Sequence, residues 1–126
     1  MGSFKVKGVI VPLITPFDEK GEILNTALQE HIEFLIACGV HGLFPCGTTG
    51  EGPLMTFEER CQIAEMIVSI VNNRIPVIIH TGALTTKETF LLTKHARDIG
   101  AQAAALLPPY YYKLAENALL HHFETV

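Results

Sequence analysis

Four continuous apolar runs, separated by amphipathic segments, constrain the fold of this chain more than any other feature. The runs are rich in residues that favour strands, and they recur at intervals of roughly 30 residues, the length of a strand–helix–strand unit. Unbroken rather than alternating apolar residues are typical of strands buried on both faces of a parallel sheet. The pattern predicts four such strands: Gly8–Leu13, Gly42–Cys46, Ile75–Ile79 and Ala103–Leu107.

The segments that follow these runs carry apolar residues at helical spacing, with polar residues between them. Thr56 with Glu59, and Thr85 with Glu88, have the spacing of capping boxes, which mark where two of the helices begin. The pattern predicts helices over Asn25–Cys38, Phe57–Asn72 and Thr86–Ile99, and a fourth that starts near Ala115.

Strand and helix therefore alternate four times, which predicts an α/β fold with right-handed crossovers and a parallel sheet. A doubly wound sheet usually has a glycine-rich phosphate turn after its first strand. Here that strand runs into Thr15–Glu19, which contains no glycine. The alternative is a (β/α)8 TIM barrel, which needs about 250 residues. We expect residues 1–126 to form its N-terminal half, about the first four βα units, with the C-terminal half absent from this chain.

Composition excludes several classes of protein. The net charge of −4 and the scattered histidines leave no basic face for nucleic acid. No apolar run approaches the roughly 20 residues of a membrane span. Three cysteines without a CxxC pair argue against a disulfide framework or a zinc site and predict a cytoplasmic location. Each cysteine is expected to be a small buried apolar residue: Cys38, Cys46 and Cys61.

In a βα barrel, chemistry gathers on the loops that follow the strands. The second such loop holds Gly47-Thr48-Thr49-Gly50, whose backbone N–H groups and two hydroxyls can converge on a small anion such as a carboxylate. The fourth loop places Tyr110–Tyr112 after two prolines. A tyrosine there either passes a proton to the reacting centre or merely seals the rim or an interface.

Histidines and carboxylates provide weaker signals. His80 ends the third strand, where it either contacts substrate or forms a hydrogen bond at the rim. His121 and His122 are adjacent and point about 100° apart on a helix, so a solvated helix face is expected. No carboxylate pair and no cluster of metal ligands stands out, so the sequence predicts a mechanism without a metal or a cofactor.

The loop motifs resemble one known family in their order and spacing. Val9–Asp18, Gly47–Glu51 with its GTTGE signature, Arg74–Gly82 and Pro109–Tyr111 are similar to segments of the dihydrodipicolinate synthase and N-acetylneuraminate lyase family. The resemblance covers nearly the whole chain. It implies a TIM barrel and a lyase or synthase of class I aldolase type, in which pyruvate forms a Schiff base with a lysine. That imine then acts as the electron sink for making or breaking a carbon–carbon bond.

The resemblance also implies roles for individual residues. Thr49 and the neighbouring backbone would hold the carboxylate of pyruvate, in a loop shaped by Gly47 and Gly50. Thr48 would belong to a hydroxyl relay that moves protons. Tyr111 would be the relay member that reaches into the site of a neighbouring subunit, in a homodimer or homotetramer. The catalytic candidates are therefore Thr48 and Tyr111, and the substrate-binding candidates are Gly47, Thr49 and Gly50.

One departure concerns the nucleophile. The family's Schiff-base lysine ends the sixth strand, and its main acid–base tyrosine follows the fifth, so both would fall beyond Val126. Lys113 alone lies at the correct end of the barrel, in a loop expected to be solvated. The chain as given is therefore expected to lack the lysine.

Several activities agree with the resemblance. It favours an enzyme like 4-hydroxy-tetrahydrodipicolinate synthase, which joins pyruvate to an aldehyde, over 2-keto-3-deoxy-gluconate aldolase or N-acetylneuraminate lyase. An alternative from another class is a non-catalytic, truncated half-barrel that pairs its exposed edges with a second copy.

Overall fold

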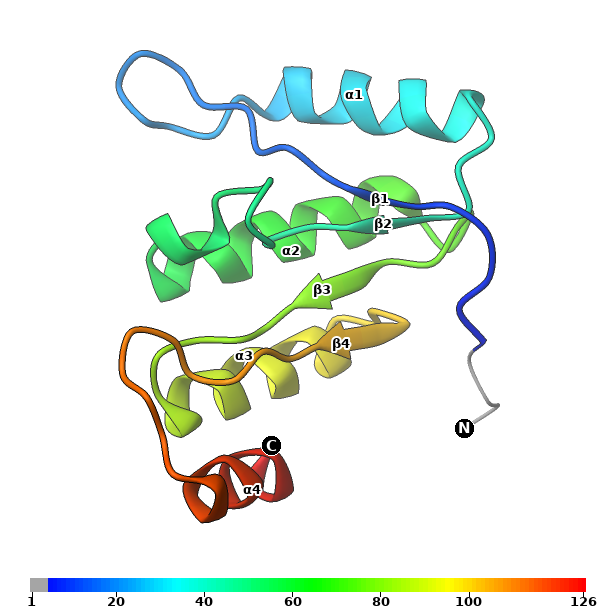
Figure 1. Cartoon of the computed structure of the whole chain (residues 1–126). Helices are drawn as coiled ribbons and strands as arrows, with labels where there is room; N and C mark the ends of the chain where they lie inside the picture. The colour runs from blue at the N-terminus through cyan, green and yellow to red at the C-terminus, as the bar shows by residue number, and fades with distance from the viewer. Residues whose placement is uncertain (1–4) are drawn as a thin grey trace.

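The computed structural model describes residues 5–126 and contains four β-strands, each followed by an α-helix (Figure 1). The strands lie side by side, and the loops that follow them emerge at the same end of the sheet. This arrangement confirms the predicted α/β class and the first four βα units of a TIM barrel. The strands are β1 (Ile10–Pro12), β2 (Gly42–Phe44), β3 (Ile78–His80) and β4 (Ala103–Ala105).

All strand pairing between neighbours is parallel. β1 pairs with β2, and β3 pairs with β4. A parallel bridge between Leu43 and Val77 connects the two pairs, and the His80 N–H donates to the Pro45 carbonyl at 3.1 Å. The strands are therefore arranged in sequence order, as successive βα units require.

The helices follow the predicted segments closely, with bounds of α1 (Asn25–Ala37), α2 (Phe57–Val71), α3 (Thr86–Asp98) and α4 (Glu116–Thr125). The predicted capping box of α2 is confirmed: the Glu59 N–H donates to Thr56 Oγ1, and the Thr56 N–H donates to Glu59 Oε2. At α3, Thr85 accepts from the Glu88 N–H, but the described bonds do not include the reciprocal one, so that capping box is only half formed. None of the described helices is long and apolar enough to cross a membrane.

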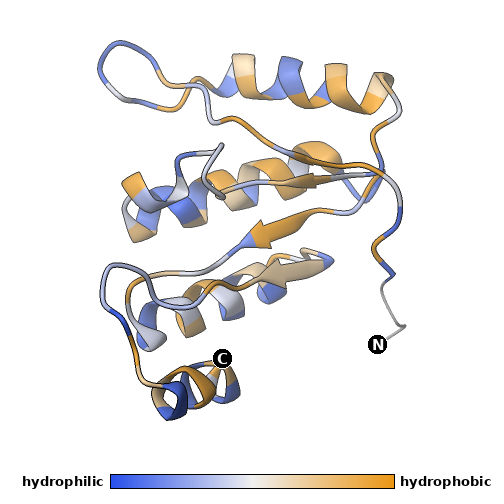
Figure 2. Ribbon diagram, viewed as in Figure 1, coloured by the Kyte–Doolittle hydropathy of each residue, from blue (hydrophilic) through white to orange (hydrophobic). Residues whose placement is uncertain are grey.

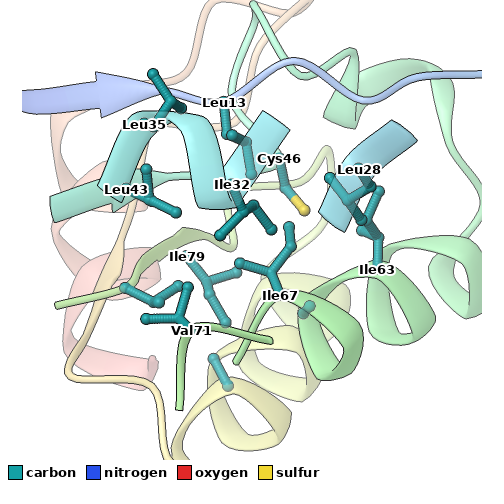
Figure 3. Packing of buried hydrophobic residues seen from close by; sticks show 13 residues of the cluster. Leu13, Leu28, Ile32, Leu35, Leu43, Cys46, Ile63, Ile67, Val71 and Ile79 are labelled. Atoms are coloured by element: carbon teal, nitrogen blue, oxygen red, sulfur yellow. The ribbon is translucent and has the colours of Figure 1, made fainter. Parts of the chain in front are cut away.

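The hydrophobic core lies between the sheet and the helices, because β1 to β3 and α1 to α3 contribute apolar residues to the same layer (Figures 2 and 3). The strand region supplies Leu13, Leu43 and Ile79, all almost fully buried. The helices cover them with Leu28, Ile32, Leu35, Ile63, Ala64, Ile67, Val71 and Ala96. Side chains alternate along an extended segment, so Ile14, next to the buried Leu13, faces away from this core, and it is 48% exposed.

The structure corrects three local expectations. The strands are shorter than predicted, and β2 ends at Phe44 because Pro45 and the left-handed backbone of Cys46 interrupt it. Cys38 is exposed rather than buried, since it caps the C-terminus of α1. His122 is buried instead of solvated: its ring packs edge-on against Phe123, and Nδ1 lies 2.9 Å from the Thr86 hydroxyl.

Candidate functional site

The loop after β2 exposes two threonines between two buried glycines. Thr48 and Thr49 are exposed, whereas the glycines on either side are buried. The Glu51 N–H donates to the Thr48 carbonyl at 3.1 Å, and the Gly52 N–H donates to the Gly47 carbonyl at 3.1 Å. Within the described residues the amides of Thr48 and Thr49 have no protein acceptor. Two hydroxyls and two N–H groups are therefore available to a small anion.

The glycines of this loop are required by close contacts rather than by their own backbone angles. A Cβ on Gly47 would lie 2.6 Å from the Phe44 ring, and one on Gly50 would lie 2.7 Å from the Leu13 carbonyl oxygen. The left-handed conformations fall instead on Cys46, with φ of 62°, and Glu51, with φ of 58°. Any side chain at the two glycines would push the loop away from the sheet.

The loop after β4 meets the threonine loop across a cavity of about 460 Å³. Its walls combine the Thr48 loop, the His80 ring and the prolines before the tyrosines, and the lining residues are Thr48, Pro53, His80, Leu107, Pro108, Pro109 and Tyr110. The structure therefore brings the two predicted loops together at one rim. The tyrosine that shares this cavity with Thr48 is Tyr110.

Tyr111 points elsewhere. It is 87% exposed, has a φ of 81°, and its ring packs edge-on against Tyr112 at 5.0 Å between centroids. Together these tyrosines line a second cavity, of about 420 Å³, with Leu84 and Thr85. A non-glycine residue rarely adopts a positive φ, and at Tyr111 this backbone goes with a highly exposed side chain.

His80, at the end of β3, forms the hydrogen bond at the rim that was one of its two predicted alternatives. It is only 4% exposed, and its Nδ1 lies 3.1 Å from the Cys46 carbonyl oxygen. Burial lowers the pKa of the His80 imidazole, the Arg60 charge lowers it further, and the bond to Cys46 partly opposes both. These effects together favour the neutral form of the ring.

Sequence reasoning missed Arg60. This residue of α2 is 4% exposed and donates to the carbonyl oxygens of His80 at 2.7 Å and Gly82 at 3.0 Å. The described ion pairs do not include it. Its position was detectable, since Arg60 precedes Ile63, Ala64 and Ile67 by three, four and seven residues and so lies on the buried stripe of the helix.

Comparisons with known proteins agree with this geometry. The sequence model of the Dihydrodipicolinate synthetase family matches residues 5–126. The 4-hydroxy-tetrahydrodipicolinate synthase of Thermodesulfovibrio yellowstonii is 43% identical over 120 residues, which cover 95% of this chain and 41% of that protein. The chain thus spans about two fifths of the length of the curated relatives that it matches.

Solved structures show the same relationship. Dihydrodipicolinate synthase from Aquifex aeolicus superimposes with a TM-score of 0.92 at 44% identity, over 95% of this chain and 41% of that one. YagE from Escherichia coli, a member of the dihydrodipicolinic acid synthase family solved in complex with pyruvate, gives a TM-score of 0.91 at 38% identity. That match covers 93% of this chain and 39% of the other.

Proposed function

The chain belongs to the dihydrodipicolinate synthetase family, and from this we propose that it carries the keto-acid-binding part of a carbon–carbon lyase or synthase. The observation that carries the proposal is the loop from Gly47 to Gly50, with two exposed hydroxyls beside a cavity of about 460 Å³. The pyruvate complex of the relative YagE supports pyruvate as the ligand. A synthase that joins pyruvate to an aldehyde is the activity that we favour.

In this proposal the loop divides two tasks between neighbouring residues. Thr49 and the N–H groups of the turn hold the carboxylate, because donors already in place stabilise an anion without having to reorganise. Thr48 lies on the cavity wall and acts in proton transfer. Tyr111 lines the second cavity rather than this one, and in our proposal its hydroxyl serves a site in a neighbouring subunit of a homo-oligomer.

In our proposal, this chain does not supply the Schiff-base lysine. All six lysines lie in the described part of the chain and are exposed, and they are absent from the lining of the Thr48 cavity: Lys5, Lys7, Lys20, Lys87, Lys94 and Lys113. A Schiff-base lysine needs an apolar pocket or a neighbouring cation to depress its pKa. We therefore propose that this chain binds the keto acid without a covalent bond.

Binding is tested by titrating the ¹⁵N-labelled chain with pyruvate and following the amide signals. We expect shifts at the four residues from Gly47 to Gly50, and a loss of affinity of about tenfold in Thr49→Val, the cost of one charge-assisted hydrogen bond. Thr26→Val, at an exposed position of α1, is the matched control. Acetone, which lacks the carboxylate, should leave these amides unmoved. Equal shifts with acetone would contradict carboxylate binding.

A covalent test addresses the lysines. After treatment with pyruvate and borohydride, the intact mass of this chain should be unchanged, because its lysines are exposed and solvated. A mass increase that maps to any of them would overturn the proposal that this segment lacks the nucleophile.

Tyr111→Phe provides a separate test of the outward-facing tyrosine. Because Tyr110, and not Tyr111, lines the Thr48 cavity, Tyr111→Phe should leave pyruvate affinity within about twofold of the parent chain, well below one hydrogen bond's contribution. Tyr110→Ala, which removes part of the cavity wall, should weaken binding. Equal losses in the two variants would contradict the separate placements.

We further propose that residues 1–126 are the N-terminal half of the barrel and that further βα units cover its inner face. A second candidate, favoured by exposed apolar residues such as Ile14 and Leu107, is that a second copy covers this face instead. Sedimentation distinguishes the two, since a concentration-dependent dimer that Ile14→Lys disrupts would support pairing between copies. A monomer at all concentrations would exclude it.

A further inference from the structure

The His80 ring is held in one defined tautomer by the backbone of the neighbouring loop. Its Nδ1 lies 3.1 Å from the carbonyl oxygen of Cys46. A carbonyl oxygen only accepts hydrogen bonds, so Nδ1 must carry the proton. In the neutral ring Nε2 is then an acceptor, and this atom is buried without a hydrogen-bond partner among the described residues.

The carbonyl that His80 binds belongs to a strained turn at the start of the threonine loop. Cys46 has a φ of 62°, a left-handed conformation that a residue with a Cβ adopts only when its surroundings impose it. The same oxygen packs so closely against Gly52 that a Cβ there would lie 1.8 Å from it. The next residues along the chain are Gly47, Thr48 and Thr49, so the orientation of Cys46 sets theirs.

The far end of the loop has a second clamp. The buried Thr15 hydroxyl, in the segment after β1, donates to the Gly50 carbonyl at 2.7 Å. The loop is therefore held at Cys46 from the β3 side and at Gly50 from the β1 side. Thr48 and Thr49, between the two clamps, are the residues left exposed.

Arg60 holds His80 in turn. Its guanidinium donates to the carbonyl oxygens of His80 and Gly82, on either side of Thr81. These bonds join α2 to the C-terminal end of β3. A buried cation beside the imidazole also disfavours a second positive charge on the ring.

We propose that His80 is a positioning residue of the keto-acid site. Its Nδ1–H donates to the Cys46 carbonyl and so orients Thr48 and Thr49. Arg60 in turn anchors His80 by donating to the backbone carbonyl of His80. The inference rests on the proposed function of the loop. His80 also lines the cavity beside Thr48, so the clamp lies within the site itself.

Two substitutions separate the two ring nitrogens. His80→Asn places an amide N–H near the position of Nδ1 and preserves the donor to the Cys46 carbonyl. The longer side chain of His80→Gln places its amide near the position of Nε2 and leaves that carbonyl without a donor. His31→Gln, on α1, is the matched control. In the ¹⁵N-labelled full chain without ligand, we expect the amide signals of Gly47 and Thr48 to move in His80→Gln and to stay in place in His80→Asn and His31→Gln.

Pyruvate titration of the same samples gives the functional result. His80→Gln should lose affinity by about tenfold, the equivalent of one hydrogen bond, while His80→Asn stays within about threefold of the parent chain. Equal losses in the two His80 variants, or parental affinity in His80→Gln, would overturn the proposal.

The ring nitrogen shifts of His80 in the parent chain need no variant and remain informative if a variant fails to fold. A protonated Nδ1 and an unprotonated Nε2 are expected, and the opposite tautomer would refute the clamp. If the parent chain binds no pyruvate, the proposed function fails. The tautomer of His80 and the loop amide signals of the ligand-free chain then test the positioning role of His80 independently.

Discussion

Single residues at the candidate site adopt states that their amino-acid type would not suggest. Cys46 is buried, as a small apolar residue should be, but it also carries a left-handed backbone that glycine normally supplies. His80 and Arg60 are polar and almost fully buried, and each binds backbone carbonyls of a neighbouring segment. Their roles come from partners distant in sequence, which residue type alone does not identify.

The thiols should differ in reactivity. Burial raises the pKa of the Cys46 thiol to about 11. At pH 8 only about one molecule in a thousand then carries the reactive thiolate. Cys38 is exposed, so iodoacetamide should label it first, with Cys46 protected. Peptide mass spectrometry reads the order of labelling, and urea should abolish the difference. Equal rates in the native chain would contradict the burial of Cys46.

His80 should make stability depend on pH below about 6.5, the ordinary pKa of an imidazole. Burial, and then the Arg60 charge, lower the pKa of the folded imidazole below its ordinary value, so the unfolded chain binds the proton more readily. The contribution of His80 to the free energy of unfolding is complete above the unfolded pKa near 6.5 and is lost as the pH falls toward the folded pKa.

Urea unfolding at several pH values measures this dependence. The free energy of unfolding should decrease on acidification through that window, and His80→Asn should flatten the decrease. His31→Asn, the control, should leave the slope unchanged. An identical slope in His80→Asn would mean that another group titrates there.

At the scale of elements, local signals predicted the helices better than the strands. The helix bounds agree within a residue or two because apolar spacing and caps are encoded by the segment itself. Each regular strand is only three residues long, whereas the apolar runs extend over five or six. Apolar residues mark burial, but strand ends depend on where the neighbouring backbone stops pairing, as Pro45 and Cys46 show at the end of β2.

The capping box of α2 gives a prediction at this scale. Thr56→Ala should reduce the free energy of unfolding by about 1 kcal/mol, because the Glu59 N–H loses its acceptor. Thr26→Ala, at an exposed position within α1, should change it little, since alanine is the better helix former. Urea midpoints with an unchanged slope measure both. A Thr26 effect as large as the Thr56 effect would rule out capping as the cause.

For the whole molecule, the two faces of the sheet differ in what covers them. The helix-covered face holds the buried apolar cluster (Figure 3), whereas Ile14, next to the buried Leu13, is 48% exposed. The described residues therefore place their stabilising core on one side of the sheet. The rim, where the loops converge, borders the open side.

A pair of truncations tests this asymmetry. Ile63→Ala, at a fully buried position of α2, should lower the free energy of unfolding by roughly 2–5 kcal/mol, whereas Ile14→Ala should lower it by less than half as much. If Ile63→Ala does not fold, Ile63→Val should still cost about 1 kcal/mol. Equal costs at Ile63 and Ile14 would indicate that the inner face is covered in solution.

The sequence by itself determined the α/β class, the order of the elements, the family, and the two loops that meet at the rim. These features follow from periodicity, caps and short motifs, which are local. Only the tertiary structure decided that Tyr110 rather than Tyr111 shares a cavity with Thr48, that His122 is buried, and that Arg60 and His80 brace the threonine loop. Each of these outcomes depends on contacts between segments about 20 to 60 residues apart, which no local pattern encodes.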